Sequence, residues 1–118
     1  MHILVIDDDP LAGEMTAAVI ESLGYETLLA SDAVDAMEQL DTHDDIGLIV
    51  SDHFMPLISG VELLHTLREQ NVTLPFILLS GENPSAALAQ TPGLTACLQK
   101  DADMEEVLTH TLRQALTP

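Results

Sequence analysis

The sequence predicts an α/β domain built on a doubly wound, five-stranded parallel sheet. Five short apolar runs alternate with segments of helical periodicity from one end of the chain to the other, which is the pattern of repeated βα units. Aromatic residues make up only 3% of the chain, and this aliphatic composition suits a sheet packed between helices. A length of 118 residues predicts a single domain over 1–118.

The first βα unit begins with the apolar run 2–6. Pro10 suits the first turn of the following helix, Asp9 suits its N-cap and Gly24 suits its carboxyl end. One face of this helix is marked by apolar residues at helical spacing, namely Leu11, Met15, Ala18, Val19 and Leu23.

The second and third units follow the same order of strand and helix. The second has a strand at 25–30 and a helix with apolar positions at Ala33, Ala36, Met37 and Leu40. The third has a strand at 46–51, then Ser59 as an N-cap with Glu62 completing a capping box. The apolar pattern of this third helix continues through Val61, Leu64 and either Leu67 or Arg68.

The last two units complete the predicted sheet. A strand at 75–79 precedes a helix at 84–90, which has the weakest helical pattern of the five. A strand at 95–99 precedes the clearest stripe, which we expect to face the core and which consists of Met104, Val107, Leu108, Thr111, Leu112 and Ala115. Right-handed crossovers place the carboxyl ends of all five strands along one edge, where a reactive crevice is expected.

Net charge narrows the classes of partner. The formal charge is -17, so phosphate backbones and anionic lipid surfaces would be repelled, whereas cations and basic protein patches would be attracted. We therefore expect no contact with nucleic acid or membrane. A single cysteine, no signal peptide pattern and no apolar run of about 18 residues favour a cytoplasmic location.

Few polar residues follow the predicted strands, and their chemistry is complementary. Asp7 and Asp8 follow the first strand and Asp52 follows the third, whereas Ser80 and Lys100 follow the fourth and fifth. If the first and third strands are neighbours, about 4.8 Å apart, Asp8 and Asp52 can share one divalent ion.

Each of these groups has a role in phosphoryl transfer onto a carboxylate. Two carboxylates with open positions suit Mg²⁺, which shares its remaining ligands with water and phosphate oxygens. An ionised aspartate accepts phosphoryl groups covalently, and the only lysine of the chain, Lys100, supplies a compact positive charge. The Ser80 hydroxyl can donate to a phosphoryl oxygen.

The same residues also have purely structural interpretations. A single aspartate from the run 7–9 is enough to cap the first helix, and Asp9 suits that role. Asp52 and Ser80 can be ordinary turn residues, and Lys100 can be a solvated lysine. We expect His53 to be structural, because it points away from Asp52 if the strand pleat persists, and Cys97 to be a small buried hydrophobe.

These motifs resemble the receiver domain of two-component response regulators. "DDDP" is similar to the acidic pair of that family, and "DHFMPLISG" fits its D-x-x-M-P-x-x-x-G pattern at Asp52, Met55, Pro56 and Gly60. Ser80 and Lys100 fall where the family has its hydroxyl and its lysine, so the resemblance covers the whole chain. It implies a flavodoxin-like (βα)5 fold with strand order 2-1-3-4-5.

The resemblance implies a role for each site residue. Asp52 would be the phosphoacceptor, Ser80 the switch hydroxyl and Lys100 the partner of the phosphoryl group. Mg²⁺ or Mn²⁺ would be bound by Asp7, Asp8 and Asp52 with the main-chain carbonyl of Phe54.

The resemblance also implies partners. The donor would be a histidine kinase or a phosphotransfer protein. The readout would pass to a downstream protein or an output domain through the face built by the fourth helix, the fifth strand and the fifth helix, with a homodimer as a further possibility. No output domain is expected within 1–118.

Several positions depart from the family pattern. Cys97 stands where receivers usually carry a Tyr or Phe that turns inward after phosphorylation. Asp101 stands where the family usually has a cis proline, and since a cis bond without proline costs about 2.5–4 kcal/mol, we expect a trans bond. Phe54 and Glu82 occupy the two variable positions that tune the lifetime of the phosphoryl group, and the ring of Phe54 can shield it from water.

Three alternatives to a phosphorylated receiver remain open at this point. A degenerate receiver would bind partners without phosphorylation, as the departures at Cys97 and Asp101 suggest. An aspartyl-phosphate phosphatase of the haloacid dehalogenase type also begins with a strand that ends in D-x-D. In this sequence Leu11 replaces the hydroxyl residue expected two positions after that motif. A flavodoxin-like electron carrier would have to place a phosphate beside three carboxylates. We expect a module that phosphorylates itself and slowly loses the group, not a turnover enzyme.

Overall fold

The computed structural model describes residues 1–55, 57–81 and 85–116. The strands are β1 (His2–Ile6), β2 (Glu26–Ala30), β3 (Ile46–Asp52), β4 (Phe76–Ser80) and β5 (Ala96–Gln99). The helices are α1 (Pro10–Ser22), α2 (Ala33–Thr42), α3 (Gly60–Glu69), α4 (Ala86–Ala89) and α5 (Met104–Leu116).

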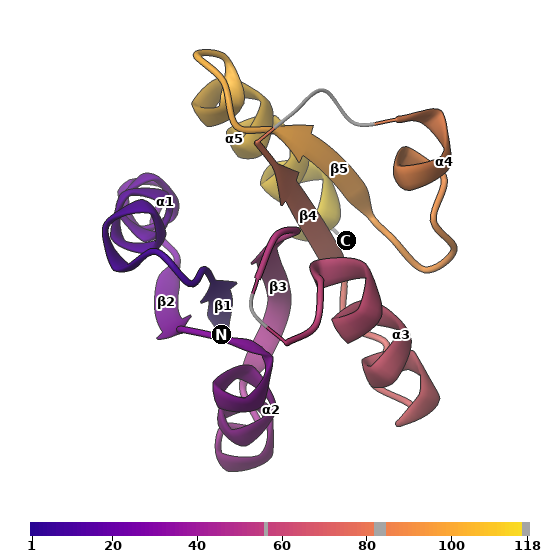
Figure 1. Cartoon of the computed structure of the whole chain (residues 1–118). Helices are drawn as coiled ribbons and strands as arrows, with labels where there is room; N and C mark the ends of the chain where they lie inside the picture. The colour runs from indigo at the N-terminus through magenta and orange to yellow at the C-terminus, as the bar shows by residue number, and fades with distance from the viewer. Residues whose placement is uncertain (56, 82–84, 117–118) are drawn as a thin grey trace.

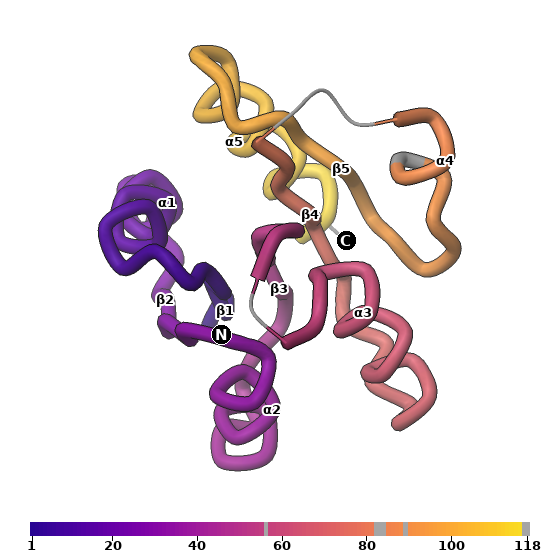
Figure 2. Tube along the Cα trace, viewed as in Figure 1, coloured from indigo at the N-terminus to yellow at the C-terminus, as the bar shows by residue number. Residues whose placement is uncertain are grey.

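All five strands are parallel and lie in the order β2-β1-β3-β4-β5, which confirms the predicted fold (Figure 1). Helices α1 and α5 cover one side of the sheet, while α2, α3 and α4 lie on the other. The trace in Figure 2 shows β1 between β2 and β3, so the first and third strands are neighbours as expected.

Side chains alternate between the two faces of the sheet and form two separate cores. Leu4, Ile6 and Ile49 belong to the core under α2 and α3, whereas Val5 and Val50 belong to the core under α1 and α5. Because both faces are covered, the central strands are almost entirely apolar, as parallel strands usually are. This arrangement leaves only the strand ends for polar chemistry.

The predicted caps are present. The Asp9 side chain accepts from the N–H groups of Leu11 and Ala12 at the start of α1, and Gly24 has a φ of 96° after its end. Ser59 and Glu62 form the reciprocal capping box at the start of α3. These caps could be predicted from the sequence because each depends on only a few neighbouring residues.

The structure confirms only part of the apolar face predicted for α1, since Val19 and Leu23 are half-buried and pack against the core. Leu11 and Met15 are 66% and 63% exposed, and Ala18 is exposed as well. The fully buried residues of the helix are Gly13, Thr16, Ala17 and Ile20. A Cβ at Gly13 would lie 3.4 Å from the Cβ of Asp7, so small residues on this face let the helix approach the sheet closely.

Three further helices differ in part from the predictions. In α5, Leu108 and Leu112 are buried, but Val107 is 42% exposed. In α3, Leu63 joins Leu64 and Leu67 in the core, and Arg68 is only half-buried. The predicted helix at 84–90 is reduced to the four residues of α4, and residue 84 lies outside the described residues.

Arg68 joins three segments that are distant in the sequence. Its guanidinium donates to the carbonyl oxygens of Val72 at 2.7 Å and of Leu74 and Gly93 at 2.8 Å each. The end of α3, the approach to β4 and the turn before β5 are therefore connected through one side chain.

Gly60 allows the turn after β3 to pack against the strand. Its N–H donates to the carbonyl of His53 at 2.9 Å, and an added Cβ would lie 2.7 Å from the carbonyl oxygen of Asp52. No larger residue fits without moving this turn, so the glycine positions the chain directly behind Asp52.

Replacement of Gly60 by alanine is therefore expected to destabilise the fold. The added Cβ would also lie 2.5 Å from Cδ1 of Leu78, and such overpacking costs about 1–3 kcal/mol. Gly81→Ala is the matched control, because nothing lies within 4 Å of its added Cβ. Urea denaturation is expected to show a loss of stability in Gly60→Ala alone, and equal stabilities of the two variants would contradict this packing.

Candidate functional site

Parallel pairing of β1 with β3 brings three carboxylates to one edge of the sheet. Ile6 pairs with Ser51, so Asp7 and Asp52 are the next residues of two adjacent strands. The N–H of Asp7 donates to the carbonyl of Ala30 at 3.0 Å, which extends the ladder to the site. Carboxylate oxygens of Asp7, Asp8 and Asp52 all lie within 4.8 Å of one another.

Lys100 follows the edge strand β5, and its side chain extends back to the carboxylates at the ends of β1 and β3. Its amine lies 3.0 Å from Oδ2 of Asp7 and 3.4 Å from Oδ2 of Asp52. Its main-chain N–H donates to the carbonyl of Ser80 at 2.7 Å, which fixes the start of the side chain beside β4. The sequence-predicted acids and the lysine are thus brought together.

Asp7 is held by hydrogen bonds on both oxygens. Oδ1 accepts from the N–H of Asp9 at 2.9 Å, and Oδ2 accepts from the amine of Lys100 at 3.0 Å. The residue is only 6% exposed, whereas its neighbour Asp8 is exposed. Asp7 is therefore a fixed acceptor, while Asp8 presents its carboxylate to solvent.

Electrostatics at the site reflect crowded charge. Burial raises the pKa of Asp52, the amine of Lys100 opposes that rise, and the carboxylate of Asp7 adds to it. Burial alone would lower the pKa of Lys100, but its contacts with Asp7 and Asp52 outweigh burial and raise it. The lysine therefore stays positively charged and partly offsets the repulsion among the acids.

The remaining predicted site residues take different positions. Ser80 is the last residue of β4 and is 2% exposed, so it lies at the same edge as Asp52. Phe54 lies two residues beyond β3, and its ring is 59% exposed and 4.8 Å from the ring of His53. Glu82 lies outside the described residues.

His53 is half-buried, and its Nδ1 is buried without a hydrogen-bond partner among the described residues. Its N–H donates to the carbonyl of Leu79 at 2.8 Å, so pairing with β4 continues one residue past Asp52. This main-chain bond does not depend on the imidazole, so the structural role expected for the His53 side chain stays a prediction.

The two departures from the family pattern have local roles. The described part of the chain contains no cis peptide, so the bond between Lys100 and Asp101 is trans as predicted. The Asp101 carboxylate accepts from the N–H of Asp103 at 3.0 Å, which shapes the turn into α5. Cys97 is half-buried in β5, and burial raises the pKa of its thiol.

Sequence reasoning missed the residues that position the site through the main chain or through small size. The carbonyl of Ala30 carries no side-chain signal. Gly13 does offer a sequence signal, since a glycine within a helical pattern often marks close packing. The structure shows it against Asp7.

The donor set fits a hard divalent cation. Three carboxylates supply oxygen ligands of the kind that Mg²⁺ prefers, and exposed Asp8 leaves room for the waters that Mg²⁺ retains. No histidine or thiol joins the described cluster, which disfavours softer metals.

Comparison with known proteins identifies relatives over nearly the whole chain. The family model of the response regulator receiver domain matches residues 3–112. The sensor histidine kinase RcsC of Escherichia coli is 34% identical over 91% of this chain. The transcriptional regulatory protein DctD of Pseudomonas aeruginosa is 36% identical over 98%. The chain spans 11% and 25% of those two proteins, respectively.

Solved structures share the fold. CheY4, a chemotaxis response regulator of Vibrio cholerae, superposes with a TM-score of 0.84 at 26% identity, covering 98% of both chains. The response regulator TrrA of Thermotoga maritima, solved with Mg²⁺ and BeF, has a TM-score of 0.86 at 24% identity, again covering 98% of both. With its sheet order, its edge of acids and a family match over residues 3–112, the chain belongs to the response regulator receiver domains.

Proposed function

We propose that this receiver domain is a signalling module controlled by phosphorylation of Asp52. The observation that carries the proposal is the convergence of three carboxylates within 4.8 Å beside the amine of Lys100. Asp52 is 9% exposed, so the nucleophile is shielded on most sides and approached from the edge of the sheet.

In the proposed reaction a carboxylate oxygen of Asp52 forms a bond to phosphorus. The bond between phosphorus and the leaving atom of the donor breaks, and the electron pair departs with the leaving group. The product is an acyl phosphate on Asp52. In the proposal Lys100, 3.4 Å from Oδ2 of Asp52, pairs with its oxygens, and the hydroxyl of Ser80 at the end of β4 donates to them.

Asp7, Asp8, Asp52 and the main-chain carbonyl of Phe54 would hold Mg²⁺ or Mn²⁺. When bound, such an ion supplies positive charge that neutralises the oxygens of the donor. Without a cation, Lys100 is the only positive group in contact with Asp7 and Asp52 among the described residues, so the acids remain incompletely compensated.

The phosphoryl group would act by shifting an equilibrium between two conformations. It replaces one charge on Asp52 by about two and adds acceptor oxygens, which favour any conformation that brings Lys100 and Ser80 closer. We propose a histidine kinase or phosphotransfer protein as the donor and α4, β5 and α5 as the readout face, either to a partner or in a homodimer. The proposed location is the cytoplasm. In this proposal the domain transfers the phosphoryl group to its own Asp52 and is not a turnover enzyme.

An unphosphorylated interaction module is the second candidate. It is favoured by Cys97, which cannot turn an aromatic ring inward, and by Asp101, which is used for the turn into α5. The described helices include none that is long and apolar enough to span a membrane, and the charge of -17 argues against nucleic acid for both candidates.

Phosphorylation is tested by incubation with acetyl phosphate and by mass measurement of the intact protein. Wild type is expected to gain one phosphoryl group in Mg²⁺ and much less in EDTA, because the donor and the site are both anionic. Asp52→Asn is expected to gain none, since an amide is not the required nucleophile. A gain that survives the substitution would reject Asp52, and no gain in wild type would favour the unphosphorylated module.

Magnesium is expected to stabilise the protein because it binds the folded state in preference to the unfolded state. A ligand at a hundred times its Kd contributes about 2.7 kcal/mol, so the urea midpoint rises with Mg²⁺ at constant ionic strength. Asp8→Asn is expected to lose most of this rise. Asp9→Asn removes the same charge but keeps a good N-cap, so it is the matched control. Equal responses of the two variants would place the ion elsewhere.

Asp52→Asn is expected to be more stable than wild type at pH 7. A raised folded-state pKa means that the folded protein loses stability as pH rises from the ordinary aspartate value to the raised one. Removal of the charge restores on the order of 1 kcal/mol without metal. The gain is expected to shrink as pH falls through that window. Asp44→Asn, which removes the same charge from an exposed turn, is the matched control in urea denaturation, and equal gains in the two variants would contradict a cost specific to Asp52.

A further inference from the structure

Helices α2 and α3 lie on the same side of the sheet and form the walls of a groove (Figure 1). Its volume is about 440 Å³, within the range of about 300–1,000 Å³ that binding pockets usually have. Most of the residues that line it are apolar, namely Val34, Met37, Leu40, Leu67 and Val72.

The apolar lining runs from the core to solvent. Leu67 is 1% exposed and belongs to the core, and Met37, Leu40 and Val72 are half-buried and pack against it. Val34 is 56% exposed, so it contributes little to the packing of the isolated domain. Because burial of apolar surface is favourable, an apolar group that enters the groove and covers Val34 is stabilised there.

Uncompensated negative charge lies beside these apolar residues. Glu38 and Asp41 line the groove and are exposed, and neither takes part in an ion pair with a described residue. No lysine, arginine or histidine is found among the described residues of the lining. The guanidinium of Arg68, next to Leu67 in the sequence, donates to three main-chain carbonyls instead.

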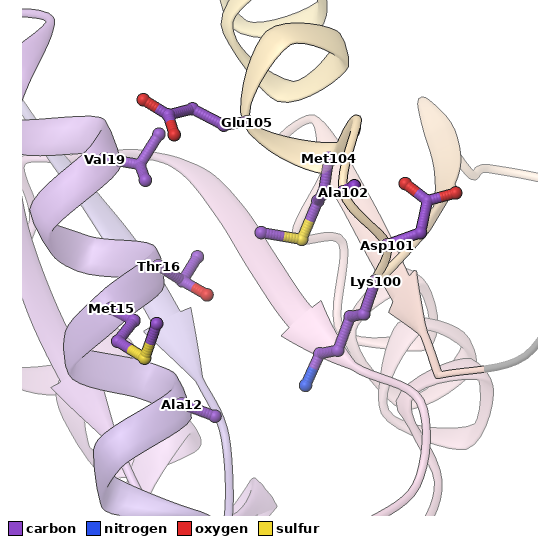
Figure 3. Close-up of a pocket in the computed structure, with 9 residues that line it drawn as sticks. All are labelled: Ala12, Met15, Thr16, Val19, Lys100, Asp101, Ala102, Met104 and Glu105. Carbon is purple, nitrogen blue, oxygen red and sulfur yellow. The ribbon is translucent and has the colours of Figure 1, made fainter.

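The groove between α1 and the start of α5 differs in this respect. Lys100 is part of its lining together with Asp101 and Glu105, and Figure 3 shows these side chains. A cation is therefore present at that groove, whereas acids are the only charged groups in the described lining between α2 and α3. A second copy of this chain would bring a net charge of -17. Charge complementarity therefore favours a basic partner over self-association.

The walls favour a helical partner over an extended one. Most main-chain groups of α2 and α3 are hydrogen-bonded within each helix, and Gln70 is the only uncharged polar residue in the described lining. An extended segment would bury main-chain groups that this lining cannot pair, and unpaired buried groups are costly. A helix pairs its own main-chain groups, so it needs to direct only apolar side chains into the groove.

The spacing of the lining residues along α2 sets the direction of the partner. Val34, Met37, Glu38 and Asp41 occupy positions i, i+3, i+4 and i+7, so they form one stripe along two turns of the helix. Seven residues with a rise of 1.5 Å each extend this stripe over about 10 Å. A partner helix that lies alongside α2 can therefore contact the apolar residues and the acids together.

We propose that the groove between α2 and α3 docks a basic amphipathic helix of a partner protein. Its apolar stripe covers Val34 and contacts Met37 and Val72, and its Lys or Arg residues pair with Glu38 and Asp41. This surface is separate from the proposed readout face of α4, β5 and α5, and it is on the other side of the sheet from α1 (Figure 1). No described residue of the lining belongs to the candidate functional site, so docking does not require phosphorylation.

The test uses a labelled, stapled peptide of about 18 residues, because shorter free helices are marginal in water. It carries leucines at i, i+3, i+4 and i+7, with lysines and glutamines elsewhere. A second peptide has the same composition and staple in a shuffled order, so it has equal charge and no stripe. Binding is measured by fluorescence anisotropy at physiological ionic strength, where attraction between distant charges is screened. The patterned peptide is expected to bind the wild-type domain about tenfold more tightly than the shuffled one.

Val34→Gln is expected to weaken binding of the patterned peptide about tenfold, because it replaces the exposed apolar contact without changing the charge. Val107→Gln is the matched control, since the substitution is identical and Val107 is 42% exposed on α5, across the sheet. Met15→Gln, at the groove shown in Figure 3, is a second control. Circular dichroism and thermal melting establish that the three variants fold.

The acids are tested by a double substitution. Glu38→Gln combined with Asp41→Asn is expected to weaken binding about fivefold and to reduce its dependence on salt, because both ion pairs are lost. Glu105→Gln combined with Glu106→Gln removes the same charge from exposed positions of α5 and is the matched control. This control is expected to change the affinity by less than about twofold.

Four results would overturn the proposal. Equal affinity for the two peptides would reduce binding to net charge. An equal loss in Val34→Gln and in either of its controls would move the contact away from α2, and equal losses in the two double variants would remove the role of the acids. A wild-type dimer in sedimentation that Val34→Gln dissociates would make the occupant a second copy. Asp52→Asn is expected to bind the peptide as wild type does, so the proposed function is tested separately.

Discussion

Crowding of like charges at one sheet edge is the constraint on which the site depends. The pairing of β1 with β3 places Asp7 and Asp52 side by side, and the apolar packing of both faces holds them there despite their repulsion. Lys100 compensates only part of that charge. This edge of the sheet therefore favours binding of a further positive charge. The packing of the two cores offsets the free energy that the remaining repulsion costs.

The sequence predicted the architecture because its signals are either local or periodic. Caps such as Asp9 and Ser59 depend on three or four residues, and buried parallel strands read as continuous apolar runs. The site residues could be grouped for a related reason, since parallel strands bring their carboxyl ends to one edge. Distances, the hydrogen bonds of Asp7 and the contribution of Ala30 required coordinates, because they depend on register and main-chain direction.

The orientation of α1 could not be predicted from its pattern. Both Leu11 with Met15 and Gly13 with Ala17 recur at helical spacing, so periodicity offers two faces of similar standing. Of the larger side chains, Leu11 and Met15 stay exposed, because close approach to Asp7 selects small residues on the fully buried face. The bounds of α4 were missed for another reason, since its weak periodicity gave no firm boundary. In α1, size complementarity with the sheet decided which face is buried, and hydrophobicity alone did not.

The guanidinium of Arg68 has a consequence for how the native state opens. It donates to carbonyls of Val72, Leu74 and Gly93, and the last of these lies 25 residues away in the sequence. Fraying of the final turn of α3 withdraws donors from three carbonyls in two loops at once. Amide hydrogens around the two loops are therefore coupled in a single cooperative subglobal unit, whose exchange with solvent proceeds together rather than loop by loop.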